Sequence, residues 1–445
     1  MRSPQPPPSV PFDREAARLL EAHPDHLRDL NQRYLPWEEV RRRPPPGRST
    51  PEQVWAALTT LRRAQARELP LFDTTGRPFR VVLTDQILEW VLRTEGAATD
   101  PHGLVRHSPS EEKAYLLDSL FEEAIHSSLI EGAVTTRVAA KTMLRRRRAP
   151  RNDGERMVLN NFRTIEMLAD LADEPLSPGL ILDIHRSMTE GTLEDARDEG
   201  RIQVPSEERV VVSDITGEVV HAPPPADQLP ERLEQLCNFA NATEPFLPPL
   251  VRASLIHFQL AYDHPFVDGT GRTARALFYW LLIRARHRLV RYLSISRIIH
   301  GSKRRYERAY VHVEQTCDTT YFLHYHVDVY RKAIDALGTW LERRREQARV
   351  TREALADWAG LNHRQKLVVK QSLDDPTTAW HAASHATTQG VTHQTALTDL
   401  KGLVVAGLLV QQRDGRGYVF LPVPDLARRV ADGPDADPRQ APLFE

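Results

Sequence analysis

Twelve consecutive residues near the middle of the chain carry side chains that could bind phosphate and move a proton. They read His-Pro-Phe-Val-Asp-Gly-Thr-Gly-Arg-Thr-Ala-Arg, from His264 to Arg275. Apolar residues at helical spacing precede them, and another apolar segment follows Arg272, so we expect the stretch to join two helices. The N-terminus of the second helix offers unpaired backbone N–H groups and a positive dipole end, which favour an anion.

The polar residues of this stretch each suit one task at a phosphate site. Gly269 and Gly271 allow backbone N–H groups to approach an anion closely. Arg272 and Arg275 lie on neighbouring parts of one helical face, where two guanidinium groups can hold phosphate oxygens. Asp268 is the candidate ligand for Mg²⁺, which prefers one or two carboxylates together with phosphate oxygens.

His264 is the candidate base toward an incoming hydroxyl, at the end of the first helix. Taken singly, a histidine at a helix end or a glycine pair in a loop is usually structural. Together the spacing resembles the signature of the Fic family, His-x-Phe-x-(Asp or Glu)-Gly-Asn-Gly-Arg-x-x-Arg, at every specified position except Thr270. The family has Asn there, so an amide donor is replaced by a hydroxyl, and by a β-branched residue that disfavours left-handed backbone. We expect this change to affect the level of activity rather than the fold.

The resemblance covers roughly residues 111 to 345 and implies a protein adenylyltransferase, which moves AMP from ATP to a Ser, Thr or Tyr hydroxyl of a target protein. It implies ATP as the substrate and Mg²⁺ as the cofactor. Backbone N–H groups of Gly269, Thr270 and Gly271 would line an anion hole. Arg272 and Arg275 would hold the β and γ phosphate oxygens.

A second informative segment begins at Glu111 and is predicted to be a long helix that ends at Gly132. Ser127 and Glu131 are one turn apart in it, and Gly132 is the expected C-cap. In isolation this is an exposed glutamate beside a helix end. It also resembles the motif (Ser or Thr)-x-x-x-Glu-(Gly or Asn) of Fic proteins with an N-terminal inhibitory helix. That resemblance implies that Glu131 pairs with Arg275 in place of the terminal phosphate of the nucleotide.

Between residues 209 and 221 the apolar period changes from helical to alternating, which predicts a β-hairpin around Asp214–Gly217. In Fic proteins a hairpin at this position overlies the site and docks the target segment by strand addition. The alternative is a purely structural ribbon. The candidate docking residues are Val210, Val211, Val212, Val219 and Val220.

The fold class expected is mainly α: a Fic-type helical core with one β-hairpin flap, followed by a C-terminal winged helix-turn-helix domain. The expected divisions are an N-terminal helical region at 1–108 with its first 12 residues mobile, a Fic domain at 109–349 with the inhibitory helix at 120–132, a winged helix at 351–423 and a disordered tail at 424–445.

Three short helices and two strands are predicted after residue 351, in the order of a winged helix. The third helix begins at Thr392–Thr395 and is the candidate reader of DNA, with Arg413 and Arg416 in the wing. Few basic residues lie on this helix, and Asp399 is acidic. A DNA partner, a protein partner and a homodimer contact therefore all stay open.

Composition restricts the class of protein. The chain has 445 residues, 41% hydrophobic and 27% charged, and a formal net charge of -1, so any attraction to nucleic acid must come from local patches. Cys237 and Cys317 have no partners at metal spacing and suit a reducing compartment. No apolar run predicts a signal peptide or membrane span, so we expect a cytoplasmic protein without a membrane partner.

Two other functions remain open from the sequence. The chain could be a winged-helix DNA-binding regulator whose Fic domain senses nucleotide or is weakly active. It could also be a de-AMPylating hydrolase, in which Glu131 positions water for the removal of AMP from a modified partner.

Overall fold

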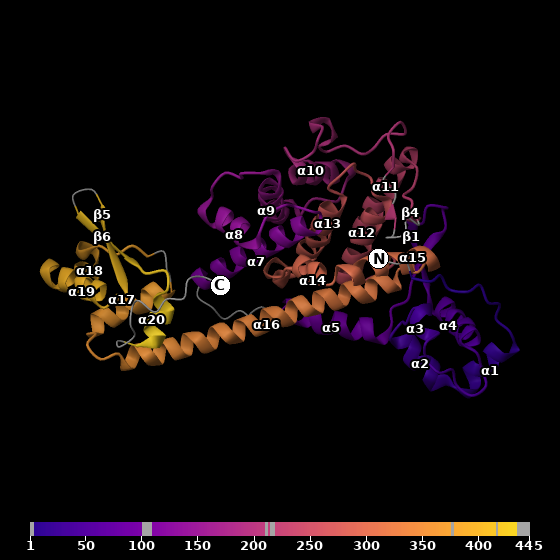
Figure 1. The fold of residues 1–445 in the computed structure, drawn as a ribbon, viewed down its shortest axis with the longest axis horizontal. Coiled ribbons are helices and arrows are strands. Elements are labelled where there is room, and N and C mark those ends of the chain that lie inside the picture. The colour runs from indigo at the N-terminus through magenta and orange to yellow at the C-terminus, as the bar shows by residue number, and fades with distance from the viewer. Residues whose placement is uncertain are drawn as a thin grey trace. The chain divides into compact units, whose positions relative to one another are not determined.

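The structure is a computed structural model that describes residues 4–99, 109–209, 212–213, 219–374, 378–414 and 417–433. The fold is mainly helical. The chain forms two compact units: Met1–Gly103 with Leu116–Ala336, and Leu104–Tyr115 with Leu337–Glu445 (Figure 1).

The described residues of the N-terminal region form five helices and a hairpin: α1 (Arg14–Ala22), α2 (Pro24–Gln32), α3 (Trp37–Val40), α4 (Pro51–Gln65), β1 (Arg67–Phe72), β2 (Pro78–Val81) and α5 (Asp85–Thr99). The elements that follow are α7 (Pro109–Ile130), α8 (Arg137–Arg146), α9 (Asp153–Leu171), α10 (Pro178–Thr189), η1 (Ala196–Asp198), β3 (Val212–Ser213), β4 (Val219–His221), η2 (Ala226–Gln228), α11 (Leu229–Asn241), α12 (Pro249–Asp263), α13 (Thr270–Arg284), η3 (Arg288–Tyr292), α14 (Ile295–Gly301), α15 (Lys303–Thr316) and α16 (Thr320–Asp357).

The centre of the first unit is the pair α12 and α13, which pack against each other (Figure 1). Nearly all residues of both helices are buried, because other helices cover them on several sides. Helices that are apolar all round are typical of a core position. The loop between these two helices is therefore held on a rigid base.

A hairpin in the N-terminal region departs from the all-helical pattern expected there. Strands β1 and β2 pair antiparallel on either side of Asp73, whose carboxylate accepts hydrogen bonds from the backbone N–H groups of Thr75 and Arg77. The side chains of Leu69 and Leu71 are buried in alternation along β1. Part of the N-terminal region that we expected to be helical is thus a β-hairpin.

The N-terminal region is part of the first unit rather than a separate domain. Backbone hydrogen bonds join Arg80 to Cys317 and Thr319. The buried Arg62 guanidinium donates to the hydroxyl of Tyr321 at 2.8 Å. At the very start of the chain, expected to be mobile, the Pro4 carbonyl accepts a hydrogen bond from Gln315. Residues 1–3 lie outside the described residues.

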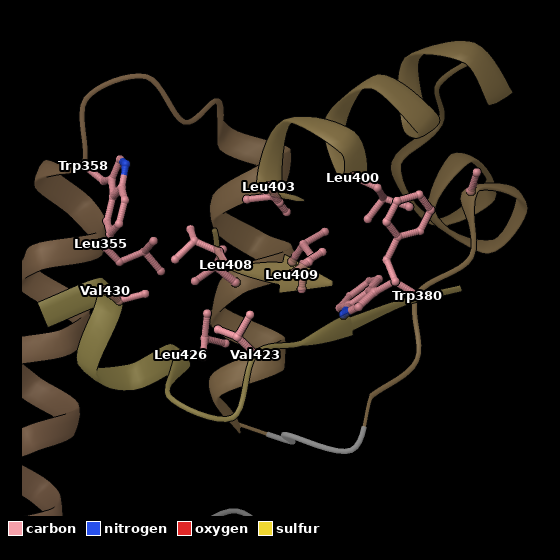
Figure 2. Packing of buried hydrophobic residues seen from close by; sticks show 14 residues of the cluster. Leu355, Trp358, Trp380, Leu400, Leu403, Leu408, Leu409, Val423, Leu426 and Val430 are labelled. Carbon is pink, nitrogen blue, oxygen red and sulfur yellow. The ribbon is translucent and has the colours of Figure 1, made fainter. Parts of the chain in front are cut away.

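After the C-terminal part of α16, the described residues of the second unit form three short helices, a hairpin and a final helix: α17 (His363–Asp374), α18 (Ala382–Gln389), α19 (His393–Val405), β5 (Leu409–Asp414), β6 (Gly417–Pro422) and α20 (Leu426–Asp432). Trp380, between α17 and α18, forms a bridge to Phe420 in β6 through two backbone hydrogen bonds of 2.9 Å. Figure 2 shows its core, in which Trp380, Leu400, Leu408 and other apolar side chains converge.

Two expected boundaries differ from the structure. The units divide at Ala336 and Leu337, inside the continuous helix α16, rather than near residue 350. The tail from residue 424 contains α20, whose Leu426 and Val430 are buried in the core of the second unit (Figure 2). Its Pro-, Asp- and Ala-rich composition suggested disorder, but two apolar residues one turn apart suffice to dock a helix. Residues 434–445 lie outside the described residues.

A membrane-spanning helix is not found in the described part of the chain, because no helix there combines sufficient length with sufficient hydropathy. Three two-stranded antiparallel sheets occur among the described residues, where one hairpin and a wing were expected.

Candidate active site

The loop from α12 to α13 is held by hydrogen bonds that a neighbouring segment donates to its backbone carbonyls. His264 ends α12 in a left-handed conformation with φ 45° and ψ 57°. The Arg209 guanidinium donates to the carbonyl oxygens of Asp263 at 2.7 Å and His264 at 3.1 Å. The N–H of Gln203 donates to the Pro265 carbonyl at 2.8 Å. These contacts hold His264 in a conformation that few residues other than glycine adopt.

The two glycines of the loop are required for different reasons. Gly269 precedes α13 with φ 83°, and a Cβ there would lie 2.6 Å from the Cγ2 of Thr189. Gly271 lies inside α13, where its backbone is helical. A Cβ at Gly271 would lie 2.3 Å from the Oε1 of Glu131. The second glycine therefore makes room for the carboxylate of Glu131 beside the N-terminus of α13.

Both arginines of the motif are buried in the interior. Arg272 is 0% exposed and donates to the Met188 carbonyl at 3.2 Å, with Asp268 Oδ2 at 3.4 Å. Arg275 is 1% exposed and donates to Ser127 Oγ and to the Ser127 carbonyl, both at 2.9 Å. Its Nη2 also lies 3.0 Å from Glu131 Oε1. Each buried guanidinium thus has one carboxylate partner, Asp268 for Arg272 and Glu131 for Arg275.

His264 is buried and close to positive charge. Burial lowers the pKa of its imidazole, and the charge of Arg209 lowers it further. A histidine with a lowered pKa is neutral near pH 7 and can accept a proton. The His264 ring therefore has the protonation state that a base requires.

Thr270 begins α13 with helical backbone, so the left-handed conformation of this turn belongs to Gly269. The expectation that a β-branched residue is strained at position 270 was therefore wrong. The change of chemistry remains: Thr270 is buried, and within the described part of the chain its Oγ1 has no hydrogen-bond partner.

Unpaired buried polar atoms gather in this stretch. Among the described residues, four of them lie between residues 264 and 275: His264 Nδ1, Thr270 Oγ1, Arg272 Nε and Arg275 Nη1. Buried polar atoms are nearly always paired, so such a cluster indicates a missing polar ligand. Two of the four belong to guanidinium groups, which makes an anion the natural ligand.

Asp268 differs from its neighbours because its side chain is 51% exposed. Its Oδ1 accepts a hydrogen bond from the Gly269 N–H at 2.5 Å. Within the described ranges, no three His, Cys, Asp or Glu side chains form a metal-binding group. A metal ion here would therefore take one protein carboxylate and depend on a substrate for its other ligands, as Mg²⁺ does with nucleotides.

The segment from Ser127 to Gly132 approaches the loop from α7. This helix ends at Ile130, and Gly132 has φ 86°, a conformation that favours glycine. Lys303 donates to the Ile130 carbonyl at 3.2 Å, which helps to fix the end of the helix. Ser127 and Glu131 consequently reach Arg275 from the same helix end.

The expected hairpin between residues 209 and 221 is described as two short strands, β3 and β4. Val212 and His221 pair, as do Ser213 and Val219, with an irregular register between them. Val219 is 57% exposed, and Val220 lies in β4. Val210, Val211 and the turn at 214–218 lie outside the described residues.

A scan against protein families matches the Fic/DOC family over residues 175–282. The chain contains a Fic domain. The protein adenylyltransferase Fic of Drosophila virilis is 31% identical over 176 residues, which cover 38% of this chain and 34% of that protein. The protein of the same name from Nematostella vectensis is 39% identical over 66 residues, covering 15% of this chain and 16% of that protein. The matched part is therefore about a third or less of these curated relatives.

Solved structures that resemble the chain also include Fic proteins. A Fic family protein from Desulfovibrio desulfuricans is 18% identical, with a TM-score of 0.48, covering 76% of this chain and 95% of that one. Fic-1 from C. elegans is 19% identical, with a TM-score of 0.48, covering 76% of this chain and 90% of that one.

Sequence reasoning missed three residues that fasten the Fic domain loop. His185 stacks on Phe266 with ring centroids 3.8 Å apart, and its Nε2 lies 2.8 Å from the Asp268 carbonyl. Because its Nδ1 accepts from the Gly200 N–H, its Nε2 must be the protonated donor. Burial lowers the pKa of His185 to about 4, which keeps it neutral.

Arg209 and His221 are the other two, at the two ends of the hairpin. His221 Nε2 lies 2.8 Å from the Tyr262 carbonyl, and Arg209 donates to the next two carbonyls along the chain. Single polar residues at the ends of an alternating apolar segment were the available signal. The sequence analysis named the valines between them as functional residues instead.

Proposed function

We propose that this protein transfers AMP from ATP to a hydroxyl side chain of a target protein. The observation that carries the proposal is the group of unpaired buried polar atoms on Arg272, Arg275, Thr270 and His264, beside the N-terminus of α13. Such a group suits a polyphosphate, because guanidinium groups and helix N-termini both bind phosphate oxygens. The name of the curated relatives, protein adenylyltransferase, supports the same reaction.

The reaction needs a neutral base and groups that compensate the negative charge of the triphosphate. The target hydroxyl gives its proton to His264, and its oxygen forms a bond to the α-phosphorus of ATP. The bond from the α-phosphorus to the bridging oxygen breaks, and pyrophosphate leaves. Backbone N–H groups at Gly269–Gly271 and the guanidinium groups of Arg272 and Arg275 stabilise the negative charge. Most of the rate enhancement then comes from positioning and electrostatics, as in other phosphoryl-type transfers.

Mg²⁺ fits this site through Asp268. That carboxylate is half exposed beside the loop, so it can take an ion that arrives with the nucleotide. Bound there, Mg²⁺ would neutralise phosphate charge.

Glu131 makes the resting enzyme weakly active. Its Oε1 lies 3.0 Å from Arg275 Nη2 and occupies the space above Gly271. A carboxylate in this position takes the place that the γ-phosphate needs, and it compensates a guanidinium that would be costly to leave unpaired. The target segment adds as a strand beside β3 and β4, with Val219 exposed next to it.

Labelling with radioactive ATP and Mg²⁺ tests the proposal in whole lysate. The variants are wild type, Glu131→Gly, Glu131→Gly with His264→Ala, and the matched control Glu174→Gly, which removes an exposed glutamate. Glu131→Gly should label target proteins at least tenfold more than wild type, about 1.4 kcal/mol in barrier. His264→Ala should abolish that gain. No gain from Glu131→Gly would refute the inhibitory role, and labelling by the double variant would refute the base.

We also propose that the second unit is a winged helix that binds DNA. Its elements follow in the order α17, α18, α19, β5 and β6. Trp380, between α17 and α18, pairs with β6 as a short strand does in a winged helix. Asp399 weighed against DNA contact, but it is 3% exposed and pairs with Arg364 at 2.7 Å, so it adds no charge to the outer face of α19. That face carries Gln394 and Lys401, both exposed.

Retention of genomic DNA fragments by the full chain tests this second activity. Lys401→Glu should reduce retention several-fold at low salt, and the exposed residue Glu353→Gln should not. Retention that is absent, or equal for Lys401→Glu and wild type, would favour a protein partner or a homodimer contact. Arg413 is exposed on β5, while Arg416 lies outside the described residues.

A further inference from the structure

Five side chains in the first unit form a continuous line of hydrogen bonds that the mechanism above does not use. Ser254 Oγ and His326 Nδ1 are 3.0 Å apart. His326 Nε2 and His257 Nδ1 are 2.9 Å apart. His257 Nε2 and the Tyr306 hydroxyl are 2.9 Å apart, and the hydroxyls of Tyr306 and Tyr310 are 3.2 Å apart. The line joins α12, α15 and α16.

The donor and the acceptor in every bond of this line follow from the hydrogen bonds of Ser254 at one end. Ser254 donates its hydroxyl proton to the Leu250 carbonyl at 2.7 Å, so toward His326 it can only accept. His326 must therefore donate from Nδ1. Burial lowers the pKa of His326 to about 3, so the ring is neutral and carries a single proton. Its Nε2 is consequently an acceptor.

The same reasoning continues along the line. His257 donates from Nδ1 to His326, and burial holds its pKa well below the usual range, so it too is neutral. Its Nε2 then accepts the proton of the Tyr306 hydroxyl. Because Tyr306 already donates its proton to His257, Tyr310 must be the donor in the bond between the two hydroxyls. A phenol oxygen that donates once and accepts once has one lone pair left.

Arg275 is the group that can use this lone pair. Its Nη1 is buried and has no hydrogen-bond partner among the residues that the structure describes. Its positive charge acts on Tyr306, because it opposes the rise that burial causes in the pKa of that phenol. If the line ran in the opposite direction, the Tyr306 proton would be free to point toward the guanidinium, which would be repulsive.

We propose that Tyr306 is a positioning residue, which the line from Ser254 through His326 and His257 holds as a hydrogen-bond acceptor for Arg275. The guanidinium then keeps its orientation when Glu131 leaves it and a phosphate takes its place. The inference rests on the proposed function, because it assigns Arg275 to the terminal phosphate of ATP. Ser254 acts at a distance, by setting the direction of the bonds.

Equilibrium binding of ATP and of AMP to the full chain tests this proposal in the Glu131→Gly background. AMP lacks the terminal phosphate, so the ratio of the two affinities reports on Arg275 and does not depend on the fraction of folded protein. Tyr306→Phe removes only the hydroxyl and should weaken ATP about tenfold, with AMP unchanged within about twofold. Ser254→Ala should shift the ratio in the same direction. Ser254→Thr keeps a hydroxyl and should restore it.

Arg275→Ala in the same background separates the two levels of the argument. If Arg275→Ala leaves ATP affinity unchanged, the proposed nucleotide site fails, and the positioning role fails with it. If Arg275→Ala weakens ATP while Tyr306→Phe does not, the site stands and the role of Tyr306 is overturned. Equal loss of ATP and AMP affinity in Tyr306→Phe would indicate a structural role only. Nitrogen NMR of the two rings should find the proton on Nδ1 in both, and protons on Nε2 would reverse the line and overturn the proposal.

Discussion

Gly271→Ala probes the contact between Glu131 and α13 without altering the charge of Glu131 or of Arg275. A Cβ at this position would lie 2.3 Å from Glu131 Oε1 and 2.8 Å from its Cδ, closer than real Cβ atoms approach. Glu131 has a flexible side chain, so we expect it to swing away and to give up its ion pair with Arg275. Loss of a hydrogen bond to a charged group costs about 1.5–3 kcal/mol.

Alanine also favours the helix over glycine by about 0.5–1 kcal/mol. The net effect of Gly271→Ala on the wild-type background is therefore a destabilisation of about 0.5–2.5 kcal/mol. In the Glu131→Gly background no carboxylate opposes the new methyl group, so only the helix gain remains. We expect the same substitution to stabilise that variant by about 0.5–1 kcal/mol.

The assay is urea unfolding without nucleotide, followed by tryptophan fluorescence, for both single variants and the double variant. Gly338→Ala is the matched control, because Gly338 lies within α16 and a Cβ there meets nothing within 4 Å. It should stabilise both backgrounds equally. If Gly271→Ala shifts the unfolding midpoint by the same amount with and without Glu131, the placement of Glu131 over Gly271 is refuted.

Three further predictions concern the loop and its supports. Thr270→Asn should tighten ATP binding several-fold in calorimetry, because an amide adds a donor where the Thr270 hydroxyl is unpaired; unchanged affinity would contradict this. Arg209→Lys should lower the rate of AMP transfer more than ATP affinity, because one ammonium cannot hold the carbonyls of Asp263 and His264 as a guanidinium does, and parallel losses would argue otherwise. The folded-state pKa of His185, about 4, lies below its ordinary 6.5, so its contribution to stability is complete above pH 6.5 and is lost as pH falls toward 4. His185→Gln should flatten that part of the urea-midpoint profile, and an unchanged slope would count against it.

Most residues of the candidate site lie close together in the sequence, so the local pattern alone groups them. From His264 to Arg275, helix spacing alone brings the base, the turn and both guanidinium groups together. The helix end at Gly132 followed from its C-cap chemistry, since that conformation favours glycine. The three helices and the hairpin of the second unit followed in the same way from apolar periodicity and turn residues.

The errors lie where a pattern is short or where distant packing decides. Strands β1 and β2 lie in a region that we expected to be helical, although the buried side chains of Leu69 and Leu71 alternate within β1. Helix α20 was assigned to a disordered tail because its composition is polar, yet Leu426 and Val430 find a core to bury them. Neither segment has enough apolar residues to form alone, so tertiary contacts determine its structure.

The sequence by itself determined the order of the elements and the chemistry of the loop, because both depend on neighbours within a few residues. The resemblance implied the pairing of Glu131 with Arg275, whereas the contacts of Arg275 with Ser127 came only from the tertiary structure. Ser127 and Glu131 reach Arg275 from 148 and 144 residues away. The tertiary structure also decided the direction of the bonds from Ser254 to Tyr306, since that direction depends on a carbonyl and three helices brought together by packing.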